Sequence, residues 1–140
     1  MGAANLHVTL AFLGGVDGAR RRCLEDCAQA LRAAPFTLVL DRSGWFRRAE
    51  VVWLGSGEAP AALSELAGAL ANCQRHCGLD PDDRPFQAHL TIARRARRPP
   101  PSGALSPLSW SVDAFCLVVS DTRPEGAAYQ VLRRWRLRTD

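Results

Sequence analysis

Two short segments of this 140-residue chain repeat one pattern, in which a histidine and a threonine alternate with apolar residues. His7 and Thr9 lie in NLHVTLAFLG. His89 and Thr91 lie in FQAHLTIAR. Since alternate residues of a β-strand share a face, each strand would present an imidazole and a hydroxyl together and bury its apolar residues behind them. Burying such polar groups without a partner costs about 1–3 kcal/mol each, so they must meet water, one another or a ligand.

Two imidazoles and two hydroxyls in one cleft suit the cleavage of a phosphodiester. One ring can take a proton from the attacking oxygen while the other gives one to the leaving oxygen, because the ordinary pKa of histidine, about 6.5, permits both forms at cellular pH. A single His-x-Thr is unremarkable strand composition. Two of the three histidines share this setting, however, which favours a joint site. We therefore expect a bell-shaped dependence of rate on pH.

The elements that must position these groups are expected in the order β-α-β-β-α-β-β-β, which indicates an α+β fold with antiparallel sheets. Strands are expected at residues 5–13, 36–40, 51–54, 87–93, 108–120 and 129–137. Helices are expected at residues 17–34 and 60–77, with Asp17 as the N-cap of the first. Residues 42–48 are expected to form a loop and residues 121–126 a turn. We expect one domain over residues 1–140.

The composition fits a compact domain, with 47% hydrophobic residues and no apolar run of the length of a membrane span. No signal peptide is expected, so the cytoplasm is the expected location. The formal charge is +4, and all 18 basic residues are arginines, which grip phosphate with a bidentate fork. The arginines at positions 94–98 are either an RNA-backbone patch or a solvated loop.

The five cysteines cannot all pair within the chain. Cys23 and Cys27 lie four residues apart, as do Cys73 and Cys77, so each pair suits one face of a helix. We expect reduced thiols facing a helix core. The alternative is a zinc site in which both cysteine pairs supply the ligands, with His76 beside one of them.

The two motifs resemble the signatures of the two-histidine (2H) phosphoesterase superfamily, and within it the family of bacterial and archaeal RNA 2',3'-cyclic phosphodiesterases, also known as 2'-5' RNA ligases. Further segments resemble that family in the same order. They are FTLVL with GWF, VVWLG, WSVDAFCLVVS and GAAYQVLRRWRL.

The resemblance implies a bilobal fold of two pseudo-symmetric antiparallel sheets, each with a helix packed outside and the active-site cleft between them. The resemblance also implies a strand and a helix ahead of the first motif, and we expect this sequence to lack that unit. The implied reaction is hydrolysis of RNA 2',3'-cyclic phosphate ends to 2'-phosphates, with no metal and no cofactor, and with 2'-5' ligation as the reverse step. We expect a monomer, with an exposed sheet edge as the route to a dimer.

The resemblance also implies a role for each site residue. His89 would activate water as general base, and His7 would protonate the leaving 3' oxygen. Thr9 and Thr91 would bind the phosphate, and Arg94 would contact it as well. Arg94 lies an odd five residues after His89, which puts it on the opposite face of a regular strand unless the strand ends or bulges there.

Two other functions stay open from the residues alone. One is a catalytically weak protein that binds RNA ends or nucleotides. The other is a sister 2H enzyme acting on a small cyclic nucleotide. Trp45 and Phe46 are expected either to stack on a base or to pack in the core. Tyr129 and Trp135 are expected in the core.

Overall fold

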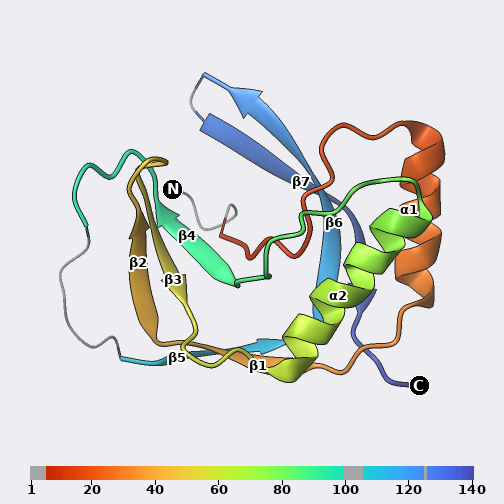
Figure 1. Cartoon of the computed structure of the whole chain (residues 1–140), viewed down its shortest axis with the longest axis horizontal. Coiled ribbons are helices and arrows are strands. Elements are labelled where there is room, and N and C mark those ends of the chain that lie inside the picture. Colours follow the sequence, from red (N-terminus) through yellow and green to blue (C-terminus); the bar gives the residue numbers. More distant parts are fainter. Residues whose placement is uncertain (1–5, 100–105, 125) are drawn as a thin grey trace.

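The computed structural model describes residues 6–99, 106–124 and 126–140 (Figure 1). Its helices and strands confirm the α+β class. The two helices are α1 (Gly18–Ala30) and α2 (Ala61–His76). The strands are β1 (Phe36–Leu40), β2 (Arg42–Phe46), β3 (Val51–Gly55), β4 (His89–Ala93), β5 (Leu108–Val112), β6 (Ala114–Arg123) and β7 (Gly126–Arg136). No helix in these described ranges is long and apolar enough to cross a membrane.

The strands pair into three antiparallel units, where two sheets had been expected. β1 pairs with β5, β3 lies between β2 and β4, and β6 pairs with β7. The expected strand at 108–120 is divided at Asp113, because β5 pairs with β1 whereas β6 turns to pair with β7. The expected turn at 121–126 is shorter, since β6 continues through Arg123 and β7 begins at Gly126.

Residues 42–48 contain a strand, so the expectation of a loop there is wrong. β2 pairs in full with β3, from Arg42 opposite Gly55 to Phe46 opposite Val51. Gly44 suggested a loop, but a glycine is needed at this strand position because a side chain would collide with Trp53. The indole ring of Trp53 lies where a Cβ atom of Gly44 would stand.

The first motif is not a regular strand within the described residues 6–13, so the expectation of a strand at 5–13 is also wrong. Only Val8 takes part in β-pairing, through an isolated antiparallel bridge to Leu90 of β4. This bridge sets the register of the first motif against the second.

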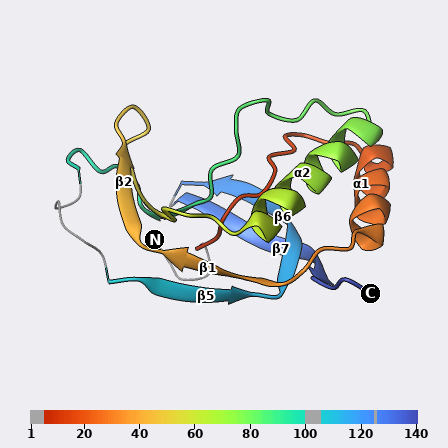
Figure 2. The ribbon, with the colours of Figure 1, turned by 60° about the horizontal axis from the view of Figure 1, so that its bottom comes forward.

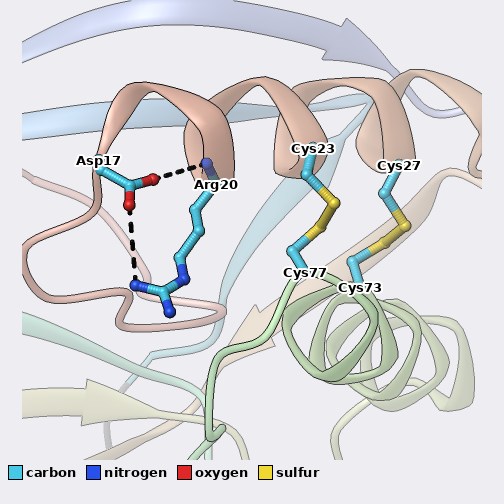
Figure 3. Close-up of a disulfide and its surroundings, with 6 residues drawn as sticks. All are labelled: Asp17, Arg20, Cys23, Cys27, Cys73 and Cys77. Carbon is cyan, nitrogen blue, oxygen red and sulfur yellow. Dashed lines mark hydrogen bonds and ion pairs between the residues drawn. A yellow bond between two sulfur atoms is a disulfide. The ribbon is translucent and has the colours of Figure 1, made fainter.

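The start of α1 and the end of α2 follow local sequence signals. Asp17 caps α1, as expected, because its Oδ1 accepts the backbone N–H of Arg20 at 2.8 Å (Figure 3). α1 ends at Ala30, four residues earlier than expected, and Ala33 pairs instead with Arg138. At the end of α2, Gly78 adopts a positive φ of 81°, which is favourable for glycine.

The two helices lie side by side against the β6–β7 hairpin (Figures 1 and 2). One core cluster joins both helices to the hairpin, and it contains Ala28, Leu66, Phe115, Trp135 and Leu137. A second joins α2 to β1 and β4, and it contains Leu38, Leu40, Leu63 and Leu90. The expected core position of Trp135 is confirmed.

Two disulfides connect α1 to the end of α2 (Figure 3). Cys23 bonds to Cys77 and Cys27 bonds to Cys73. The expectation of reduced thiols is wrong, and the zinc alternative fails because all four of its sulfurs are in disulfides. Since the helices run side by side, cysteines four residues apart on each of them meet in two rungs. Cys116, on β6, is free and exposed.

Candidate active site

The second motif opens β4, and its polar side chains share one face. His89 lies opposite Gly55 of β3, and Thr91 lies opposite Trp53. Leu90, between them, points to the other face and is buried in the core. Sequence alternation predicted this arrangement, which leaves His89 and Thr91 half-buried.

The first motif joins this face through the bridge between Val8 and Leu90. In an antiparallel pair, opposite residues point to the same face, and Val8 packs with Leu90 in the core. The neighbouring positions are then aligned crosswise. Thr9 comes beside His89, and His7 comes beside Thr91. His7 and Thr9 are exposed, so the four polar side chains gather on the accessible face of the two segments.

A hydrogen bond fixes the orientation of the His89 ring. Its Nδ1 lies 3.2 Å from the carbonyl oxygen of Gln87. A carbonyl can only accept, so Nδ1 carries a proton in this contact. In the neutral ring Nε2 then has a free lone pair, which is the form required of a general base.

A register shift in β4 lies just before Arg94. Thr91 pairs with Trp53, but the next pair joins Ala93 to Val52, so Ile92 is an extra residue on β4. The extra residue shifts the alternation by one position just before Arg94, so the face expected from a regular strand no longer applies there. A regular strand would have placed Arg94 on the opposite face.

Aromatic rings contact both histidines. The ring of Tyr129 lies 4.6 Å from that of His7, measured between centroids. The ring of Phe46 lies 5.3 Å from that of His89 and is nearly perpendicular to it. Tyr129 had been expected in the core, whereas the structure places it beside a site histidine. Phe46 is 41% exposed, so the core position is wrong for this residue, and stacking on a base stays a prediction.

Trp53 contacts Phe46, with 5.4 Å between the ring centroids. Its indole covers two glycines, since a Cβ atom would come within 2.0 Å of it at Gly44 and within 2.8 Å at Gly55. The sequence held a signal for this arrangement. That signal is the pair of glycines, Gly44 opposite Trp53 and Gly55 two residues after it, although only the pairing of β2 with β3 brings Gly44 to the ring.

Gly44→Ala is expected to lower the free energy of unfolding by about 1–3 kcal/mol, because the added methyl group would displace the Trp53 ring. Urea unfolding measures the change. Gly68→Ala is the matched control, since Gly68 is exposed on α2 with no atom near its Cβ position. It should instead stabilise by about 0.5–1 kcal/mol through helix propensity. Equal stability of Gly44→Ala and the unsubstituted protein would contradict the position given for Trp53.

The carboxyl group of Asp82 has a perturbed pKa. Asp82, in the loop before β4, accepts hydrogen bonds from the side chain and backbone of Arg84, which lower its pKa to about 2. Because the pKa is lowered, this favourable contact is present above the ordinary pKa and is lost only as the pH falls toward 2. Asp82 is therefore ionised near neutral pH and does not serve there as a general acid.

Two His-x-Thr segments aligned on one accessible face, with an arginine at the end of one strand, are the arrangement of a 2H phosphoesterase. The sequence profile of the 2'-5' RNA ligase superfamily matches residues 2–124, and the chain belongs to that superfamily. Within the described residues, no group of three His, Cys, Asp or Glu side chains is placed to hold a metal ion.

Characterised proteins and solved structures show the same relationship. The RNA 2',3'-cyclic phosphodiesterase of Escherichia coli K12 is 38% identical to this chain, over 96% of the chain and 77% of the relative. The Thermus thermophilus protein of the same name is 34% identical, over 95% and 72%. Among structures, E. coli LigT complexed with 3'-AMP has a TM-score of 0.84 at 36% identity, covering 97% of this chain and 79% of that one.

Proposed function

We propose that this chain is an RNA 2',3'-cyclic phosphodiesterase, which opens a terminal cyclic phosphate to a 2'-phosphate. Family membership and the names of its relatives support the activity. The bridge between Val8 and Leu90 is the observation that carries the proposal to this chain's own residues, because it aligns both His-x-Thr segments on one face.

In the proposed mechanism, Nε2 of His89 takes a proton from water, and the water oxygen attacks phosphorus. The bond between phosphorus and the 3' oxygen breaks, and His7 gives a proton to that oxygen. The products are a 3'-hydroxyl and a 2'-phosphate. The hydrogen bond of His89 to the Gln87 carbonyl supports its role as base, since it leaves Nε2 for the water.

Three further residues would hold the phosphate. The hydroxyls of Thr9 and Thr91 would donate to its non-bridging oxygens. The guanidinium of Arg94 would stabilise the negative charge that develops in the transition state, and the register shift just before it supports a position on this face. No step of this sequence requires a metal ion or another cofactor.

Incubation with an RNA ending in a 2',3'-cyclic phosphate, in the presence of EDTA, tests the proposal. The expected product is the same RNA with a 2'-phosphate, formed at the rate seen without EDTA. A 3'-phosphate product would reverse the assignment of the leaving oxygen. Loss of turnover in EDTA would contradict the metal-free mechanism, and absence of turnover in both conditions would overturn the activity.

RNA ends are the proposed partner. The cytoplasmic location and the monomeric state remain predictions. The two disulfides argue against the cytoplasmic location, because such bonds are typical of oxidising compartments and are rare in the cytosol of most organisms.

A further inference from the structure

Five arginines from two separate segments gather at one end of the β2–β3–β4 sheet. The turn between β2 and β3 supplies two of them, and the segment after β4 supplies three. They are Arg47, Arg48, Arg95, Arg97 and Arg98, and we call them the arginine surface. Figures 1 and 2 both show the segment after β4 beside the β2–β3 turn.

Two hydrogen bonds hold the two segments together. The backbone N–H of Ala96 donates to the carbonyl of Glu50 at 2.7 Å, and the indole N–H of Trp45 donates to the carbonyl of Ala96 at 2.9 Å. Glu50 and Arg95 both adopt positive φ angles, 53° and 58°, which non-glycine residues adopt only where their surroundings impose it. The segment after β4 is therefore docked on the hairpin in a defined conformation.

The charges of the arginine surface are unneutralised within the described part of the chain. All five side chains are exposed, and none takes part in an ion pair or a side-chain hydrogen bond there. Arginines elsewhere do find carboxylates, as Arg84 finds Asp82 and Arg134 finds Asp113. The one acidic residue on either segment is Glu50, so positive charge dominates this end of the sheet.

Along the chain, the arginine surface follows directly after the site residues of β4. β4 runs from His89 to Ala93, a rise of about 13 Å at the usual 3.3 Å per residue. Arg94, assigned to the reacting phosphate, is followed directly by the docked segment. A chain of phosphates leaving the site in this direction would meet guanidinium groups, which bind phosphate with charge-assisted and often bidentate hydrogen bonds.

We infer that the arginine surface binds backbone phosphates of the nucleotides that precede the cyclic end, so that an oligoribonucleotide binds more tightly than a cyclic mononucleotide. The inference rests on the proposed function for the location of the reacting end. It goes beyond that function in naming the residues that bind the RNA ahead of its reacting end.

The test compares Arg97→Gln/Arg98→Gln with a control, Arg22→Gln/Arg136→Gln, which removes two exposed arginines from α1 and β7. Each protein is titrated, over a series of salt concentrations, with a fluorescent RNA of about eight nucleotides that ends in a 2'-phosphate. Each lost phosphate contact should reduce the slope of log Kd against log salt by about 0.7, so the arginine-surface variant should lose about 1.4. The control should retain the slope of the unsubstituted protein.

Turnover supplies the second measurement. KM for an oligonucleotide with a cyclic end should rise in the arginine-surface variant, while KM and kcat for cytidine 2',3'-cyclic phosphate should stay unchanged. An unchanged salt slope, or an equal loss in the control, would overturn the inference. An unsubstituted protein that binds the RNA with the expected slope but hydrolyses neither substrate would overturn the proposed function and leave the arginine surface supported.

Discussion

Replacement of either site histidine by alanine is expected to lower kcat on an RNA cyclic phosphate by about 10²–10⁴, the usual contribution of one positioned proton transfer. His7→Ala would remove the proposed donor to the leaving oxygen, and His89→Ala the proposed acceptor from water. Because the two groups act in one reaction, the double variant should be scarcely slower than either single variant. Product formation under saturating substrate measures all three.

His76→Ala is the matched control for this experiment, since His76 is the remaining histidine of the chain and lies exposed on α2. It should turn over substrate at the rate of the unsubstituted protein. Thermal unfolding of each variant shows whether the fold is retained. A rate near that of the unsubstituted protein in either His7→Ala or His89→Ala, with the fold intact, would refute the role assigned to that ring.

Loss of the two disulfides is expected to have the largest effect on stability. The bonds join residues 54 and 46 positions apart, and closing a loop of either size stabilises by about 4 kcal/mol in the chain-entropy description. The loop from Cys27 to Cys73 lies inside that from Cys23 to Cys77, so the second bond adds less than the first. Replacing all four cysteines by serine should therefore lower the midpoint of thermal unfolding by about 10 °C or more.

Cys116→Ser provides the control, because this thiol is free and exposed on β6. Its unfolding midpoint should match that of the unsubstituted protein. Addition of a dithiol reductant to the unsubstituted protein should reproduce the shift seen in the four-serine variant and should leave that variant unchanged. Identical midpoints for the oxidised protein and the four-serine variant would mean that the bonds do not stabilise the fold.

The sequence predicted most of the helical structure because the helices depend on local signals. Asp17 caps α1 and Gly78 follows α2 with a positive φ, as expected for these residue types. The disulfides could not be predicted in the same way. Cysteines four residues apart define a helix face, but only the side-by-side packing of α1 and α2 brings the two faces together.

Strand boundaries depended on partners that are distant in the chain. β2 was missed because Gly44 indicates a loop until the Trp53 ring is seen to occupy the space over it. The strand predicted around the first motif is reduced to one bridge, since only Val8 pairs with β4 among the described residues. Asp113 divides the next predicted strand because its two parts have different partners.

The alternation of the two motifs was enough to predict which residues share the accessible face, because it depends only on the period of an extended chain. The neighbours of the histidines were not predictable in this way. Phe46 and Tyr129 come from β2 and β7, far along the chain from the rings that they contact. The irregularity just before Arg94 is likewise set by the register of β4 against β3.

A crystal structure with a bound nucleoside 2'-phosphate would test most directly whether His7 and His89 serve one phosphorus atom. We expect Nε2 of both rings to lie within hydrogen-bonding distance of the phosphate oxygens, about 2.6–3.2 Å, with Thr9 and Thr91 on the remaining oxygens. A phosphate held by one histidine alone, with the other ring directed elsewhere, would contradict the two-histidine mechanism.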